Sequence, residues 1–325
     1  MVILAILAGV GLGYIIERGD MCFHSTIRGL FRQPRQIELL RAYLLTLLIA
    51  TPLVWLMTIL GWINPWVAPF AWSANIVGGL IFGIGMVVAA TCITGLFYKL
   101  GHGMLGTLVA LVTWAIGDIV TYIGPLKPLR EALNRNPVTT NGEISTLSNI
   151  FGPIGPILII GLGIAIAVWL WQSPRVSRGD YWGWLLLGSA VGLFTSLAWL
   201  LADAGNSDYP YGTSGVPASL YLALTQGQTL WSPWITISLV SLIPGALIAA
   251  VVSGTLWVRG ETLHRYLELA GGGLLMGVGA AISGGCNLGH SLIGVPLLSL
   301  GSIATTLSMV AGVWIAHQVG IRLRN

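Results

Sequence analysis

The sequence predicts an all-α polytopic membrane protein, with about nine transmembrane helices plus short re-entrant helices in two inverted, pseudo-symmetric halves. Its 325 residues are 55% hydrophobic and only 8% charged, with a mean hydropathy of +0.84. Soluble domains carry about 25% charged residues, so most of this surface cannot face water. The apolar runs are continuous and about 20 residues long, as helices that span the bilayer require. A membrane barrel would instead need short alternating strands.

Nine apolar runs are candidate transmembrane helices. The first is short for a helix perpendicular to the membrane, and the seventh is long enough to tilt. Tryptophans lie near several run ends, where interfacial aromatic residues are enriched. The runs cover residues 1–16, 38–60, 73–91, 103–123, 153–171, 181–202, 231–257, 265–284 and 299–320.

The basic residues predict the orientation of the chain. With the amino terminus outside, 12 of the 15 Lys and Arg residues fall in inner loops, where such residues concentrate in membrane proteins. We therefore expect an outer amino terminus and an inner carboxyl terminus. These residues are scattered and form no basic block, so we expect no nucleic-acid partner. The inner set is Arg18, Arg28, Arg32, Arg35, Arg41, Lys99, Arg175, Arg178, Arg259, Arg265, Arg322 and Arg324.

Two glycine-rich stretches that lie far apart in the chain share one pattern. Residues 78–92 read GGLIFGIGMVVAATC, and residues 272–286 read GGLLMGVGAAISGGC. A shift of 194 positions superimposes their glycines and pairs Cys92 with Cys286. An odd number of predicted spans separates the copies, so the second enters the membrane upside down relative to the first. Inverted repeats of this kind are typical of transporters, whose substrate site lies between them.

We therefore expect a single membrane transport domain over residues 1–325. Its first repeat covers 1–123, a connector with one transmembrane helix covers 124–180, and the second, inverted repeat covers 181–325. The connector contains a polar stretch with Asn141-Gly142 as a turn, which we place on the outer surface.

Four apolar connections are too short to cross a bilayer. Such segments occur at membrane depth only when they line a cavity or are buried in protein, so we predict re-entrant half-helices. Three of them have a cysteine at or next to the start, namely Cys22, Cys92 and Cys286. A single cysteine in a membrane helix is usually an inert small hydrophobe, but packing alone would accept Ala or Ser at all three places. The connections are 20–31, 93–102, 286–298 and the run from Val216 to Leu224.

The chemistry of these helix starts predicts an anion site. The first N–H groups of a helix are unpaired and carry the positive end of its dipole. A thiol adds a weak donor and a soft, polarisable sulfur. Together these groups suit an anion with a large, soft, weakly hydrated sulfur end.

These motifs resemble those of the YeeE/YedE family, bacterial inner-membrane transporters of sulfur compounds. The likeness rests on GxGxxxxxxCxxG in both halves and on GDMCFHS at residues 19–25, and it spans essentially the whole chain. The resemblance implies uptake of thiosulfate ion across the lipid bilayer, relayed between Cys22, Cys92 and Cys286 by S–H···S hydrogen bonds. It also implies a small cytoplasmic TusA-like sulfur-carrier protein as partner. In a bacterial inner membrane, the outer amino terminus expected from the basic residues is periplasmic and the inner carboxyl terminus is cytoplasmic. No cofactor is expected.

Residues beside the cysteines complete the predicted pathway. His290 follows Cys286 by four positions, so both lie on one face of a helix. His24 follows Cys22 by two positions and does not share its face. Glycines let the backbone approach a ligand closely. Besides the two histidines, this set contains Asn287, Gly285, Gly95 and Gly289.

A second set of polar residues is tied less closely to the cysteines. Thr94 follows Cys92, and Lys99 and His102 could supply positive charge at the inner mouth. Asp118 lies inside a predicted span, where an acid is a candidate for proton coupling. We expect Asp20 to cap the short helix that follows it. The plain alternative for each is an interfacial residue that reaches solvent or headgroups.

Three other functions fit parts of this pattern. Transport of another sulfur or selenium compound, as in the YedE branch, would use the same motifs. A soft-metal transporter would bind Cu(I) through thiols and thioethers, but the methionines are dispersed. A membrane thiol enzyme would exchange sulfur or electrons with a soluble partner, but no cofactor motif and no neighbouring pair of cysteines favour it. The chain has no P-loop, so we expect no ATP hydrolysis by it.

Overall fold

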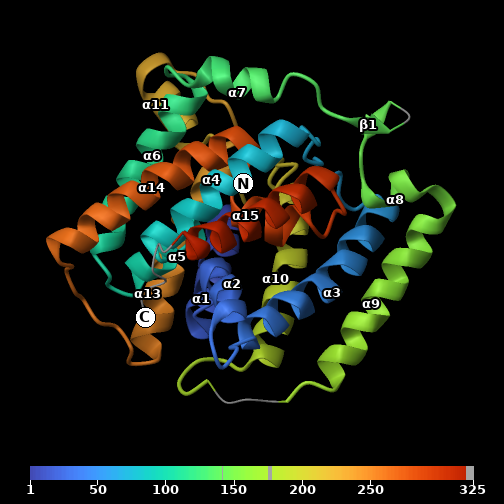
Figure 1. Cartoon of the computed structure of the whole chain (residues 1–325), viewed down its shortest axis with the longest axis horizontal. Helices are drawn as coiled ribbons and strands as arrows, with labels where there is room; N and C mark the ends of the chain where they lie inside the picture. The colour runs from blue at the N-terminus through green and yellow to red at the C-terminus, as the bar shows by residue number, and fades with distance from the viewer. Residues whose placement is uncertain (141, 175–177, 320–325) are drawn as a thin grey trace.

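The computed structural model describes residues 1–140, 142–174 and 178–319, which form a bundle of helices (Figure 1). Asn141 of the predicted turn, Arg175, Arg322 and Arg324 lie outside the described residues. The elements of the first repeat and the connector are α1 Val2–Gly19, α2 Phe23–Phe31, α3 Glu38–Ile59, α4 Trp72–Ala89, α5 Ile93–Gly101, α6 Gly106–Tyr122, α7 Lys127–Leu133, β1 Thr139–Thr140, β2 Glu143–Ile144, α8 Leu147–Phe151, the 3₁₀ turn η1 Gly152–Ile154 and α9 Gly155–Trp171.

The remaining elements follow the connector. The π-helical segment η2 stands where the third cysteine-containing connection was predicted. These elements are α10 Trp184–Ala204, α11 Val216–Gln226, α12 Pro233–Val240, α13 Leu242–Val252, α14 Leu263–Ser283, η2 Asn287–Gly294 and α15 Leu300–Gln318.

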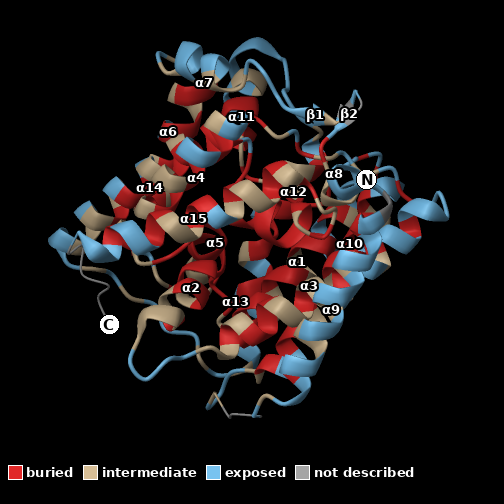
Figure 2. Ribbon diagram, turned by 45° about the vertical axis from the view of Figure 1, so that its right-hand side comes forward, coloured by how far each residue is buried: buried red, intermediate tan, exposed pale blue. Residues whose placement is uncertain are grey.

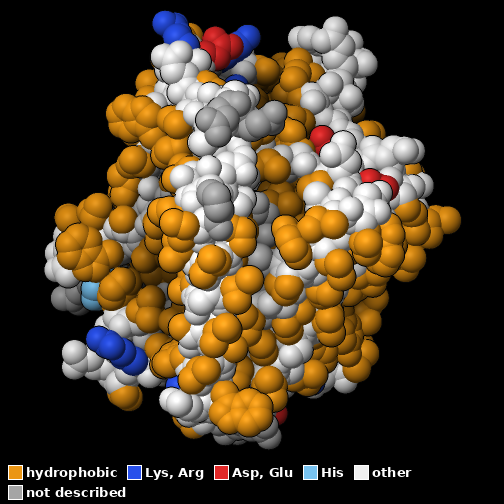
Figure 3. Space-filling model, turned by 90° about the vertical axis from the view of Figure 1, so that its right-hand side faces the viewer, with side chains coloured by type: hydrophobic (Ala, Val, Ile, Leu, Met, Phe, Trp, Pro, Cys, Tyr) orange, Lys and Arg blue, Asp and Glu red, His pale blue; other side chains and the backbone are white. Residues whose placement is uncertain are grey.

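The helices form where the apolar runs predict them. In the described residues, seven helical stretches are long and apolar enough to cross a membrane, or eight when α6 and α7, bent by 70°, count as one. α9 is a shorter apolar helix of 17 residues. Figure 3 shows one side of the molecule, where hydrophobic side chains cover the middle and charged side chains gather towards the top and the bottom. The all-α polytopic class is confirmed.

The predicted run 231–257 is longer than the helices that form there. The chain makes α12 and α13, and α13 ends at Val252. Gly254 then adopts a left-handed φ of 68°, a conformation that commonly follows a helix end. Trp257 belongs to the next loop, and its N–H donates to the carbonyl oxygen of His102 at 3.2 Å.

α4 and α14 pack through glycines in reciprocal contacts. A Cβ atom on Gly279 would lie 2.7 Å from the carbonyl oxygen of Gly78, and one on Gly272 would lie 2.7 Å from the carbonyl oxygen of Gly85. The 194-residue shift carries Gly78 to Gly272 and Gly85 to Gly279, so each contact is the counterpart of the other. Two copies related by a two-fold axis produce contacts of this kind.

The outer partners of these two helices repeat the pattern. A Cβ atom on Gly117 of α6 would lie 2.5 Å from the carbonyl oxygen of Leu274, and one on Gly312 of α15 would lie 2.4 Å from that of Leu80. The same shift superimposes Leu80 on Leu274. Small residues at such crossings let membrane helices approach closely, and here they fix how the two halves of the chain meet.

The four short connections are helical. α2, α5 and η2 are mostly buried, whereas α11 is buried only in its first turn. The chain runs from α1 into α2 and from α4 into α5 as apolar stretches of 30 residues, so each stretch is a helix broken just before a short segment. Figure 2 shows the buried part of the ribbon concentrated in the middle of the molecule, with α9 largely exposed. The depth of these segments in a bilayer stays a prediction.

Candidate functional site

The three cysteines each begin a short helix in the same way. Cys22, Cys92 and Cys286 are the N-caps of α2, α5 and η2, and each has extended backbone. Two residues before each cysteine the backbone is left-handed, which ends the preceding helix. We call the segments 20–22, 90–92 and 284–286 the cysteine corners. The left-handed residues are Asp20, Ala90 and Gly284, with φ of 43°, 50° and 82°.

Two of the thiols meet. All three cysteine side chains are fully buried and unbridged. The sulfur atoms of Cys22 and Cys92 lie 3.4 Å apart, within range of an S–H···S hydrogen bond. The Cys92 N–H donates to the Cys22 sulfur at 3.4 Å, and the Gly95 N–H donates to the Cys92 sulfur at 3.3 Å. The sequence shows no neighbouring pair because the two cysteines are 70 positions apart.

Gly95 leaves the space that this thiol pair occupies. A Cβ atom there would lie 2.2 Å from the Thr91 hydroxyl oxygen and 3.1 Å from the Cys22 sulfur. Gly289, its counterpart after Cys286, has only ordinary contacts, with no atom nearer than 3.7 Å. Gly95 is therefore packed closely against the protein's own thiol pair, whereas Gly289 is not, and the predicted approach of a ligand to these glycines stays a prediction.

The Cys286 corner is held by histidine. The Leu288 N–H donates to the Cys286 sulfur at 3.2 Å. The ring of His290 packs on Gly285, where a Cβ atom would lie 2.7 Å from it. Its Nδ1 lies 3.0 Å from the Ser302 hydroxyl oxygen and its Nε2 lies 3.1 Å from the Ser283 carbonyl oxygen. Both ring nitrogens are thus engaged within the protein.

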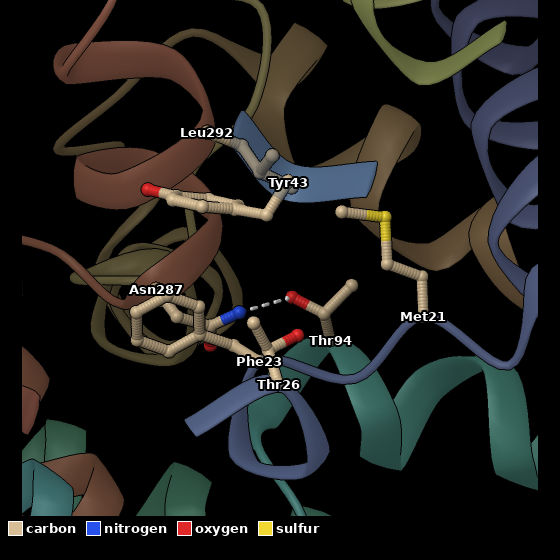
Figure 4. A pocket seen from close by; sticks show the side chains of 7 residues that line it. All are labelled: Met21, Phe23, Thr26, Tyr43, Thr94, Asn287 and Leu292. Carbon is tan, nitrogen blue, oxygen red and sulfur yellow. Dashed lines mark hydrogen bonds between the residues drawn. The ribbon is translucent and has the colours of Figure 1, made fainter. Parts of the chain in front are cut away.

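A narrow cavity lies where α2, α3, α5 and η2 meet (Figure 4). Its volume is about 10 Å³, room for roughly one water molecule. The Asn287 amide donates to the Thr94 hydroxyl oxygen at 3.0 Å and so joins η2 to α5. These residues follow Cys286 by one position and Cys92 by two. The cavity is lined by Met21, Phe23, Thr26, Tyr43, Thr94, Asn287 and Leu292.

The other predicted polar residues fall into two groups. His24 is only 1% exposed, and neither ring nitrogen has a hydrogen-bond partner within the described part of the chain. Lys99 and His102 lie at the far end of α5, where His102 pairs with the carboxylate of Glu17. Lys99 is partly exposed, and its Nζ lies 6.0 Å from the ring centroid of Tyr98. His24 is thus two residues from Cys22 in the chain, whereas Lys99 and His102 lie at the opposite end of α5 from Cys92.

The predicted cap by Asp20 is wrong. α2 has Cys22 as its N-cap, with no side-chain cap hydrogen bond. The left-handed backbone of Asp20 instead makes it the residue that closes α1, with its N–H donating to the Glu17 carbonyl oxygen at 3.1 Å. Its carboxylate turns to α5 and accepts a hydrogen bond from the Tyr98 hydroxyl at 2.7 Å.

The chain matches the family model described as sulphur transport over residues 18–315. It belongs to this YeeE/YedE family. It is 30% identical to the thiosulfate transporter TsuA of Spirochaeta thermophila, over 97% of both chains. It is 24% identical to TsuA of Escherichia coli, over 97% of this chain and 94% of that one. The probable transporter YedE of Salmonella typhimurium is 30% identical over 54% of this chain and 42% of its own length.

The resemblance drawn from the cysteine motifs is therefore confirmed. The family and these relatives are named as transporters and not as enzymes. The matched stretch includes all three cysteine corners.

Asp118 of this family member is a helix cap. Its side chain is fully buried. Its two carboxylate oxygens accept the N–H groups of Gly215, at 2.8 Å, and Ala218, at 3.2 Å, at the start of α11. The fourth short helix, which has no cysteine, thus carries an internal carboxylate at its positive end, where an anion is stabilised. The Ser214 hydroxyl, just before α11, donates to the Ala280 carbonyl oxygen at 2.9 Å.

Side chains that the sequence analysis missed hold the helix ends before the cysteine corners. The last turn of a helix leaves four carbonyl groups unpaired. Arg130 donates to the Ala281 carbonyl oxygen at 2.9 Å, near the end of α14. Arg178 donates to the Gly19 carbonyl oxygen at 2.6 Å, and Arg265 donates to that of Ala89. The only signal in the sequence is that basic residues lie at or beyond the ends of predicted spans.

Proposed function

We propose that this chain takes up thiosulfate across the bacterial inner membrane along its three cysteines. The observation that carries the proposal is the buried Cys22–Cys92 pair, with 3.4 Å between sulfurs, at the starts of two helices. Support also comes from two relatives named as thiosulfate transporters that match over 97% of the chain. A pair of thiols in apolar surroundings suits a soft ion better than a hard one.

The proposed relay uses hydrogen bonds and no covalent step. The terminal sulfur of thiosulfate accepts an S–H hydrogen bond from one cysteine and is then passed to the next. In the predicted orientation α14 ends towards the outside, whereas α1 and α4 end towards the inside. Cys286 then receives the ion first, and Cys92 and Cys22 follow. N–H groups of Gly95 and Leu288 point at two of these sulfurs and stabilise negative charge there.

His24 is the proposed additional donor. Its imidazole is buried two residues after Cys22, with both nitrogens unpartnered among the described residues. A buried polar group without a partner is unfavourable, and an anion that passes Cys22 would supply the missing acceptor.

The wider arrangement is part of the same proposal. The reciprocal glycine contacts of α4 and α14 support one domain made of the repeats 1–123 and 181–325, joined by the connector 124–180. The excess of Lys and Arg residues in the predicted inner loops supports a periplasmic amino terminus and a cytoplasmic carboxyl terminus. A small TusA-like sulfur carrier on the cytoplasmic side would remove the arriving ion.

The decisive experiment measures radiolabelled thiosulfate uptake by cells that lack other uptake routes. We expect Cys92→Ala and Cys286→Ala to abolish uptake and Cys22→Ala to reduce it, while membrane levels of the protein stay normal. Sulfate, sulfite and selenium oxyanions serve as competitors and report the substrate class. Normal transport by the double variant without Cys92 and Cys286 would rule out the relay.

A membrane thiol enzyme is the second candidate, because the Cys22–Cys92 sulfurs are close enough to exchange sulfur. In this alternative the Cys92 thiolate attacks the terminal sulfur of thiosulfate, the S–S bond of the ion breaks and sulfite leaves, so a persulfide forms on Cys92 and should turn over. Mass spectrometry of the intact purified protein distinguishes it from a relay, in which the thiols stay unmodified.

A further inference from the structure

Each of the three cysteine-capped helices places a polar side chain in the same cavity. Thr26 follows Cys22 by four residues, Thr94 follows Cys92 by two, and Asn287 follows Cys286 directly. All three line the void where α2, α5 and η2 meet (Figure 4). The relay through the thiols makes no use of these hydroxyl and amide groups.

Asn287 has an unused hydrogen-bonding group in this void. Its side chain is 2% exposed, and its Nδ2 donates to the Thr94 hydroxyl oxygen at 3.0 Å. Its Oδ1 has no partner among the residues that the structure describes. Buried polar atoms are almost always hydrogen-bonded, so an unpartnered amide at a cavity wall indicates a missing ligand.

The amide can present either of its ends to the cavity. A half-turn about the last side-chain bond exchanges Oδ1 and Nδ2. The Thr94 hydroxyl then donates to Oδ1, and both N–H bonds of Nδ2 become free for an acceptor in the void. Thr26 can contribute in the same way, since its hydroxyl at present donates to the Cys22 carbonyl oxygen at 3.0 Å. The cavity thus changes from one with a spare acceptor to one with several donors.

We propose that this cavity is the subsite for the oxygen end of a tetrahedral sulfur oxyanion. The proposal rests on the thiosulfate relay, and it assigns the ion's two ends to different groups. Thiols hold the soft terminal sulfur, while Asn287 and Thr26 hold the hard oxygens, which prefer N–H and O–H donors, and the Thr94 hydroxyl fixes the turned amide of Asn287. Sulfate has no soft end for the thiols, and hydrosulfide has no oxygens for the amide.

The void must widen to accept such an ion. At about 10 Å³ it has room for roughly one water molecule, so the structure shows the closed form of the subsite. Met21 and Leu292 form part of its wall. A methionine side chain has three rotatable bonds and adapts readily. These side chains can therefore move without a rearrangement of the helices.

The test compares isosteric variants by the concentration dependence of thiosulfate uptake. Asn287→Asp keeps the size but replaces the donor with a carboxylate, and we expect the KM for thiosulfate to rise at least about tenfold, as loss of a hydrogen bond to a charged group does. Thr94→Val should raise KM in the same direction, and Thr94→Ser should restore it. Thr195→Val is the matched control, because within the described part of the chain its buried hydroxyl donates only to carbonyl groups of its own helix.

The outcomes separate this subsite from the relay. An unchanged KM in Asn287→Asp and Thr94→Val, with Cys92→Ala inactive, would overturn the subsite and leave the relay standing. Normal uptake by the cysteine variants would remove the relay whatever the Asn287 variants do. If Asn287→Asp fails to reach the membrane, the Thr94→Val and Thr94→Ser pair decides: a KM raised in the first and normal in the second supports the subsite, and equal KM values reject it.

Discussion

At the scale of single residues, the two glycines that follow Cys92 and Cys286 occupy equivalent places but face different surroundings. A side chain at Gly95 would meet Thr91 and the Cys22 sulfur, whereas one at Gly289 would meet nothing nearer than 3.7 Å. The repeat pattern of the sequence cannot distinguish them. Only the first has a partner cysteine from another helix against it.

Gly95→Ala should therefore disable transport and Gly289→Ala should not. The added methyl group pushes the Cys22 and Cys92 sulfurs apart, and overpacking of this kind costs about 1–3 kcal/mol, enough to lower uptake about tenfold. The measurement is radiolabelled thiosulfate uptake normalised to protein in the membrane. Equal activity of the two variants would contradict the assigned role of the thiol pair.

The cysteines themselves could be predicted from the sequence, and their surroundings only in part. Cys22, Cys92 and Cys286 are rare residues at corresponding places, so their helix starts were predicted correctly. The left-handed backbone of Ala90 could not be predicted, because alanine favours the right-handed helix and the left-handed conformation is sterically unfavourable for it. The prediction that Asp20 caps α2 was wrong because its left-handed backbone could not be predicted either. Its position two residues before Cys22 suits an N-cap of α2, but its backbone ends α1.

At the scale of helices, Asp118 explains why the fourth short helix differs from the other three. Its carboxylate occupies the positive end of α11, so that this helix start has no site for a second anion. No local pattern announces this contact, because its partners lie about 100 positions further along the chain. From the sequence alone, Asp118 is therefore an isolated acid inside a predicted span, which indicates proton coupling.

Asp118→Ala should destabilise the protein by about 1 kcal/mol, the typical cost of losing an N-terminal cap. Asp203→Ala, at an exposed position of α10, is the control and should change stability by less than about 0.5 kcal/mol. Thermal unfolding in detergent provides the comparison. Asp118→Asn distinguishes capping from proton coupling: a cap predicts retained uptake, and a proton carrier predicts stable but inactive protein.

Helix positions were predictable and some helix ends were not. Apolar runs predict the positions of helices because lipid offers no hydrogen-bond partners, so the backbone N–H and C=O groups must pair with each other within a helix. The predicted end of the run 231–257 was wrong because its last residues are apolar but form a loop, in which the Trp257 N–H donates to the His102 carbonyl oxygen. An apolar stretch indicates contact with lipid or with the protein interior, and it does not by itself indicate a helix.

At the scale of the whole molecule, the reciprocal contacts of α4 and α14 make the two repeats mutually dependent. Gly78 and Gly272 occupy matched places, and each faces backbone of the opposite helix. Substituting either one pushes the same two helices apart, from one end or from the other.

Gly78→Val and Gly272→Val should consequently cause similar losses of stability, each of about 1–3 kcal/mol from overpacking. Gly161→Val, on α9, is the control, since a Cβ atom there meets nothing within 4 Å. Thermal midpoints in detergent test this. A large defect in one variant beside a normal partner would argue against a two-fold relation.

The small size of the cavity limits what else can pass through this part of the protein. Protons and small cations leak across membranes along files of water, and a void with room for roughly one water molecule cannot hold such a file. While it is empty, this cavity therefore offers protons and small cations no continuous file of water between the three cysteine-capped helices.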